Sequence, residues 1–184
     1  MGNKTIHKLF SSPVFQFQVD NYESINKSLT EYIYKLKKED DKGIKRSNVN
    51  GWHSKNFKIE KDNVPYNFIK TIHGYVKEVI VDGFGWRYIP EKVGISEIWS
   101  IINKKGTFNT SHNHPGSYLS AAYYVKAPDE CGDIHFFDPN EIKKFNSPPI
   151  ENRTELSASG FSIKAQEGSL LIFPSYLYHD VVKN

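Results

Sequence analysis

The stretch HNHPGSYLSAAYYV, residues 112–125, decides how the second half of this chain is interpreted. It opens with His112 and His114, one residue apart, and continues into a run of small and aromatic residues that is typical of a strand. On extended backbone the side chains of residues i and i+2 project to the same side. Two neutral imidazoles at this spacing can reach one ion, and imidazole is a ligand for iron, zinc, copper and nickel. The stretch therefore predicts part of a metal site beside a strand.

A third histidine, His179, lies in the apolar segment EGSLLIFPSYLYHDVV, residues 167–182. Pro174 marks a turn within this segment, and His179 begins the short apolar run that follows. A β-barrel brings a distant side chain to an H-x-H pair by placing it at the mouth of a later strand. We therefore predict a metal bound by His112, His114 and His179, with open coordination positions for small ligands. The alternative is that His179 only ends a strand.

The first part of the chain has helical periodicity. Apolar residues recur every three or four positions over about residues 21–40 and again over about 63–81. Pro65 suits the first turn of the second helix, and His73 lies off its apolar face, where we expect it to be exposed. The residues that can cap the two helices are Asp20 or Asn21 and Asp62 or Asn63.

After residue 85 the pattern changes to short runs of β-branched and aromatic residues separated by Gly, Pro, Asn and Asp. Helices followed by strands predict an α+β fold, mainly β, in which helices flank a sandwich or barrel. We expect one domain, because 184 residues is a usual domain size. The segment 138–160 has no periodicity, and a loop of this length is either a lid over a site or disordered. The predicted strands are 95–102, 118–125, 133–137, 161–165 and 169–173.

The charge of the chain does not indicate a particular partner. Lys and Arg number 24 against 21 Asp and Glu, giving a formal net charge of +3. The densest basic run is interrupted by acidic residues, so we interpret it as a solvated helix end and turn and expect no nucleic-acid partner. This run contains Lys35, Lys37, Lys38, Lys42, Lys45 and Arg46.

The cysteine count and the apolar pattern bear on where the protein works. Cys131 is the single cysteine, so neither an intramolecular disulfide nor a cysteine-based zinc site is predicted, and a reducing compartment fits. The opening residues lack the apolar core of a signal peptide, and no run approaches about 18 apolar residues. We expect a soluble, intracellular, cytoplasmic protein without a membrane partner.

Three stretches of the chain resemble a known superfamily. Together they resemble the iron(II)- and 2-oxoglutarate-dependent oxygenases of the double-stranded β-helix superfamily, in particular a prolyl-hydroxylase-like group found in marine bacteria and their phages. Two weaker stretches, LFSSPVF at 9–15 and RSNVNGWHS at 46–54, also fit this group. The stretches that carry the resemblance are HNHPGSYLSAAYYV at 112–125, CGDIHFFDP at 131–139 and EGSLLIFPSYLYHDVVKN at 167–184.

The resemblance implies a fold and a set of site residues. The fold is a jelly-roll, cupin-like barrel over about residues 85–184, with helical support over about 21–81. His112 is then the first iron ligand, His114 stands where the family usually has a carboxylate, and His179 is the distal ligand. Tyr124 corresponds to a tyrosine that hydrogen-bonds the 2-oxoglutarate carboxylate. The alternative for Tyr124 is a core aromatic of the barrel.

The resemblance also implies an activity. Such enzymes use dioxygen to decarboxylate 2-oxoglutarate to succinate and to hydroxylate a C–H bond of a substrate. Kinship to prolyl hydroxylases suggests a peptidyl residue as substrate, but a fold does not fix a substrate. Apolar neighbours, for which we expect Trp99, Phe136 and Phe173, would exclude water from the site.

The chain departs from the family pattern at two places. His114 replaces an acidic ligand, so the ion would keep its full charge, and zinc, nickel or copper become candidates beside iron. The family also clamps the far carboxylate of 2-oxoglutarate with an Arg or Lys roughly nine to eleven residues beyond the distal histidine. That position, about 188 to 190, lies beyond Asn184, and we expect the natural chain to continue through one more core strand.

Two other interpretations stay open. The chain also approaches the two cupin motifs, although the usual glutamate is missing from residues 115–119. The matching residues are Gly106, His112 and His114 in the first motif and Gly168, Pro174 and His179 in the second. A three-histidine cupin-type metalloenzyme is therefore an alternative. The other alternative is a metal-free β-sandwich that binds a ligand or a partner.

Overall fold

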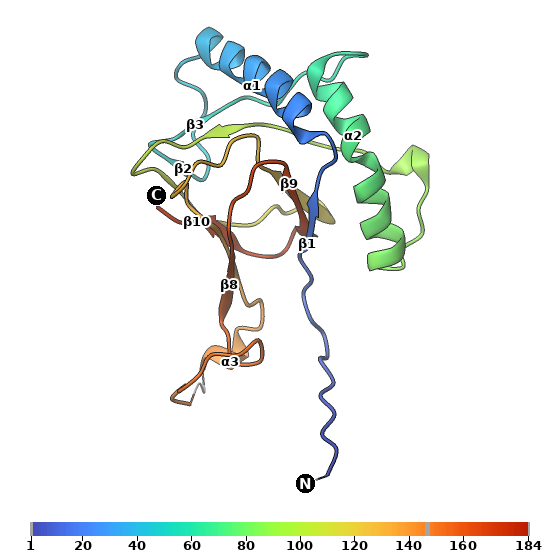
Figure 1. Cartoon of the computed structure of the whole chain (residues 1–184), viewed down its shortest axis with the longest axis vertical. Coiled ribbons are helices and arrows are strands. Elements are labelled where there is room, and N and C mark those ends of the chain that lie inside the picture. Colours follow the sequence, from blue (N-terminus) through green and yellow to red (C-terminus); the bar gives the residue numbers. More distant parts are fainter. Residues whose placement is uncertain (1, 146–147, 184) are drawn as a thin grey trace.

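The computed structural model describes residues 2–145 and 148–183. Two helices, α1 (Tyr22–Glu39) and α2 (Val64–Glu78), cover one face of a three-stranded sheet, and a five-stranded sheet packs against its other face (Figure 1). The chain is therefore mainly β with helical support, as the sequence predicts.

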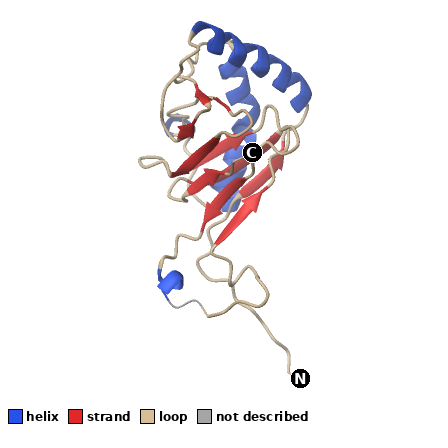
Figure 2. Ribbon diagram, turned by 90° about the vertical axis from the view of Figure 1, so that its left-hand side faces the viewer, coloured by secondary structure: helices blue, strands red, loops and turns tan. Residues whose placement is uncertain are grey.

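All paired strands are antiparallel. The strands are β1 (Phe15–Gln18), β2 (Asn48–Val49), β3 (Trp52–His53), β4 (Ile101–Ile102), β5 (Phe108–His112), β6 (Leu119–Tyr123), β7 (Ile134–Phe137), β8 (Gly160–Ile163), β9 (Ser169–Pro174) and β10 (His179–Val181). The three-stranded sheet has the order β1-β9-β6, the five-stranded sheet the order β2-β5-β10-β7-β8, and β3 pairs with β4. Figure 2 shows these strands from the side, with the helices over one face.

The two helices form where the apolar periodicity places them. At the start of α2 the Asn63 side chain accepts a hydrogen bond from the Tyr66 backbone amide at 2.9 Å, and Pro65 occupies the first turn, as predicted. Asn21 precedes α1 with a left-handed backbone and makes no side-chain cap bond, so the predicted cap is not formed there. Among the described residues, no helix combines the length and apolar character of a membrane span.

The core consists of two apolar clusters on the two faces of β9. Leu170 and Ile172 point toward α1 and α2 and join a helix-side cluster with residues such as Leu29. Leu171 and Phe173 point the other way and join a sheet-side cluster between the two large sheets. All four β9 side chains are buried because the strand lies between a helical layer and a second sheet.

Several strands differ from the prediction. Only Ile101–Ile102 of the predicted strand 95–102 forms a regular ladder, while Ile98 and Ser100 accept isolated backbone bonds from Phe57 and Ser54. The strands β1, β2 and β3 were not predicted. The last two have two residues each, which is too short for a visible alternation.

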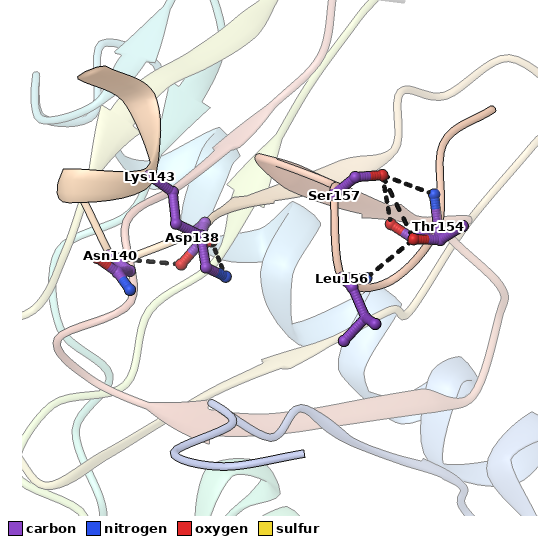
Figure 3. A network of polar contacts seen from close by, with 6 residues as sticks. All are labelled: Asp138, Asn140, Lys143, Thr154, Leu156 and Ser157. Atoms are coloured by element: carbon purple, nitrogen blue, oxygen red, sulfur yellow. Dashed lines mark hydrogen bonds and ion pairs between the residues drawn. The ribbon is translucent and has the colours of Figure 1, made fainter. Parts of the chain in front are cut away.

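The aperiodic segment after β7 contains a short helix, α3 (Ile142–Phe145), and in Figure 1 it extends away from α1 and α2. Figure 3 shows two local networks in it. The Asp138 carboxylate accepts from Lys143 and from the Asn140 amide, and the Ser157 hydroxyl accepts from the Thr154 amide. These contacts join members of the segment to one another, and Glu155 also forms an ion pair with Lys8. The two interpretations of the segment, a lid and a disordered loop, both stay predictions.

Candidate metal centre

The three predicted histidine ligands lie together at one end of the five-stranded sheet. His112 ends β5 and His179 begins β10, and the two residues are direct partners in the antiparallel register. His114 follows β5 by two residues, and its backbone amide donates to the Ser175 carbonyl at 3.0 Å. One nitrogen of each ring lies within 4.8 Å of the corresponding nitrogen of the other two. This spacing allows one ion to be bound by all three.

Hydrogen bonds to backbone carbonyls fix the tautomers of two of these rings. Nδ1 of His112 lies 2.8 Å from the Thr110 carbonyl oxygen, and Nδ1 of His179 lies 3.0 Å from that of Leu177. Because a carbonyl oxygen can only accept, Nδ1 carries the proton in both rings. Each Nε2 then keeps a free lone pair, which is the arrangement that metal-binding histidines require.

Burial favours the neutral form of two of the three rings, those of His114 and His179. His179 is 5% exposed, and burial together with the neighbouring imidazoles lowers its pKa to about 4. Burial also lowers the pKa of His114, helped by His112 and opposed by the Glu97 carboxylate. Neutral rings at physiological pH are ready to act as ligands without losing a proton first.

Aromatic rings surround the cluster on its inner side. The ring centroid of Phe173 lies 4.9 Å from that of His179, and the Phe136 ring lies 5.9 Å from it. The ring centroids of Trp99 and His114 lie 5.6 Å apart. The three aromatic residues expected from the sequence are therefore the ones in contact with the histidines.

A chain of polar side chains that the sequence did not reveal reaches the cluster from the other side. Asn103 donates to the Asn109 carboxamide oxygen at 2.9 Å, and Asn109 donates to the Ser47 hydroxyl at 3.1 Å. Ser47 Oγ in turn lies 3.5 Å from Nε2 of His112, the nitrogen that keeps its lone pair. Asn109 is 2% exposed, so these bonds hold Ser47 in a defined place. The stretch 46–54 was the available signal, because it resembles the oxygenase group.

One further histidine, His53, lies behind the site instead of on the surface. His53 is buried, stacks on Trp99 with centroids 5.6 Å apart, and bonds the Ser54 carbonyl through Nδ1 at 2.6 Å. It therefore supports the wall of the site from behind. His135 points away from the core, because Ile134 and Phe136 face inward, and its Nδ1 lies 2.9 Å from the Ser162 hydroxyl.

Tyr124 directly follows β6 and packs into the sheet-side cluster. Burial raises the pKa of its hydroxyl, with smaller contributions from Cys131 and Asp133, so the phenol stays protonated and can donate a hydrogen bond. Ser120 belongs to the same face of β6 by alternation, and its hydroxyl lies 2.7 Å from that of Ser175. The space between the two large sheets thus has hydroxyl groups as well as apolar walls.

The family of this site follows from its sequence. Residues 97–184, which include all three histidines, match the model of the family described as "Putative 2OG-Fe(II) oxygenase". This matched segment belongs to the 2OG-Fe(II) oxygenases. The oxygenase has no significant match among curated proteins.

The fold has a counterpart among solved structures. It is similar to the crystal structure of a Pseudomonas putida prolyl-4-hydroxylase, with a TM-score of 0.64 and 12% sequence identity. The match covers 95% of this chain and 87% of that chain, so it includes the helical support as well as the sheets.

Proposed function

We propose that the oxygenase binds Fe(II) through His112, His114 and His179 and hydroxylates a peptidyl residue with 2-oxoglutarate and dioxygen. The observation that carries this proposal is the meeting of three ligand nitrogens, within 4.8 Å of one another, inside the matched segment. The donor set fits the ion, because imidazole suits iron and two of the rings already expose Nε2.

The bound iron and 2-oxoglutarate supply the oxidative chemistry, in which decarboxylation to succinate accompanies hydroxylation of the substrate. The chain itself orients the histidine ligands and shields the site from water. The Thr110 and Leu177 carbonyls fix the His112 and His179 rings, and Phe136 and Phe173 exclude water from the inner side. Substrate approaches from the side that these rings leave open.

The co-substrate is proposed to lie between the two large sheets, which we interpret as the two halves of a double-stranded β-helix. Tyr124 would donate its hydroxyl to the 2-oxoglutarate carboxylate, and the raised pKa of this buried hydroxyl, which keeps it protonated, supports that role. The hydroxyls of Ser120 and Ser175 lie on the same inner side.

A second candidate is a three-histidine cupin-type metalloenzyme. His114, standing where this family usually has a carboxylate, favours it, because three neutral ligands leave the ion with its full charge and also suit zinc, nickel or copper. The two candidates differ in whether 2-oxoglutarate binds the metal.

The test is anaerobic addition of Fe(II) and 2-oxoglutarate to the full chain, followed by visible absorption. The expected result is the weak charge-transfer band of the metal chelate, absent in His112→Ala and His179→Ala. His73→Ala is the matched control, because His73 is exposed on α2 and bonded only to Tyr88. Metal uptake without the band would favour the cupin alternative, and unchanged metal content in His112→Ala would exclude this metal site.

A further inference from the structure

A cleft lined by several lysines lies near the candidate metal centre. It has a volume of about 470 Å³ and lies between the end of α1, the turn that follows and the β2–β3 and β4–β5 connections. Four lysines line it, with Asp41 as the one acidic lining residue. The lysines are Lys37, Lys42, Lys45 and Lys104.

These lysines come from separate segments and meet in space, which the sequence alone did not indicate. Within the described part of the chain none of the four forms an ion pair, while nearby Asp40 is bonded to Lys55 at 2.9 Å. Unpaired ammonium groups around a hollow produce a positive potential that favours an anionic ligand. We call this site the lysine cleft.

The lysine cleft has a preformed floor. The Trp52 indole is buried, donates to the Asp40 carbonyl at 2.8 Å and carries the Lys37 ammonium 5.3 Å above its ring. Gly43 has φ +59, and a Cβ there would lie 2.4 Å from the His53 carbonyl oxygen, so the turn can approach β3 only with glycine. The walls are therefore held in place without a ligand.

The segment that forms one wall of the cleft also reaches the histidines. Asn48 lines the cleft and pairs with Asn109 on β5, while the preceding Ser47 lies 3.5 Å from His112 Nε2. From Asn109 to His112 the strand advances about 10 Å, the length of roughly three extended residues. A peptide could therefore occupy both places at once.

We propose that the lysine cleft binds an acidic side chain of a peptidyl substrate, a few residues away from the residue that is hydroxylated. The part of this inference that concerns a hydroxylated peptidyl substrate rests on the proposed function. A nucleic acid fits less well, because the aromatic residue of the cleft is buried and offers no face for base stacking. Lysines also act as point charges, which suits a flexible carboxylate.

The test measures binding of a fluorescein-labelled peptide of alternating Glu and Gly to the full chain at low salt. The cleft variant combines Lys45→Glu with Lys104→Glu, and the control combines Lys61→Glu with Lys92→Glu. All four positions are exposed, so both variants should fold and both change the net charge equally. We expect about tenfold or greater weakening in the cleft variant and less than about twofold in the control.

Three results would overturn the inference. They are equal weakening in both variants, equal binding of a peptide with Gln in place of Glu, and tighter binding of a labelled oligouridylate. The assay needs neither metal nor 2-oxoglutarate. A missing charge-transfer band with selective peptide binding therefore rejects only the proposed function, and a normal band without selective binding rejects only the lysine cleft.

Discussion

The two faces of β9 look onto different surroundings. Leu170 and Ile172 enter the helix-side cluster, which is enclosed by α1, α2 and the strands around them. Leu171 and Phe173 enter the smaller sheet-side cluster, which ends at His179. One strand thus contributes one face to a closed core and the other to the wall of the site. The enclosed core and the candidate site therefore lie on opposite sides of the three-stranded sheet.

The largest expected effect separates these two faces. Leu170→Ala should lower the free energy of unfolding by about 3–4 kcal/mol, because its enclosed surroundings cannot collapse into the cavity. Leu171→Ala should cost less, about 2 kcal/mol, because the smaller cluster can adjust. Urea denaturation measures both. Equal losses would show that the two faces are equally rigid.

The next effect concerns acid stability of the metal-free protein. The pKa of His179 is about 4 in the folded state, against the ordinary value of 6.5 in the unfolded chain. Below pH 6.5 the unfolded chain therefore binds a proton at this histidine, whereas the folded chain does not. The free energy of unfolding falls as the pH decreases toward 4, by roughly 3 kcal/mol in total. Denaturation at several pH values should show this loss in the natural chain and a smaller loss in His179→Gln. The same slope in both would assign the loss to other groups.

Two adjacent tyrosines at the end of β6 point to opposite sides of the three-stranded sheet. Tyr124→Phe should weaken 2-oxoglutarate binding by about 0.5–3 kcal/mol, because one hydrogen bond to the carboxylate is lost. Tyr123 is the matched control, since it points to the helices and donates to Asn26 at 2.7 Å. Tyr123→Phe should lower stability and leave 2-oxoglutarate affinity unchanged. Calorimetry with the metal-loaded protein measures the affinity, and an unaltered value in Tyr124→Phe would make Tyr124 a core residue only.

The smallest expected effect concerns Ser47. Ser47→Ala should weaken metal binding about tenfold or less, because Asn109 loses its acceptor and the strand that carries His112 is held less firmly. Ser111→Ala, at an exposed position beside His112, should leave the affinity unchanged. Titration with Zn(II) would measure both. A larger effect at Ser111 would contradict the assigned polar chain.

The sequence predicted the parts of the site that depend on local spacing. His112 and His114 were linked by strand alternation, and the two helices by apolar periodicity with Asn63 as a cap. The alternation of Phe15 and Phe17 marked β1 as well, although it was not used. These features depend on neighbours along the chain, so a single sequence contains them.

The features that were missed depend on pairing between distant segments. Ser47 reaches His112 only because β2 pairs with β5, and two-residue strands leave no periodic signal. The convergence of Lys45 and Lys104 on one cleft also required the folded chain.

The pairing of His112 with His179 has a consequence for the unfolded chain. An ion bound by these residues would join β5 to β10 and close a long loop that contains β6, β7, β8 and β9. Such a cross-link reduces the conformational entropy of the unfolded state, as a disulfide does, and ties metal affinity to folding. In a chain whose single cysteine excludes an internal disulfide, the metal would act as a reversible clasp between its strands.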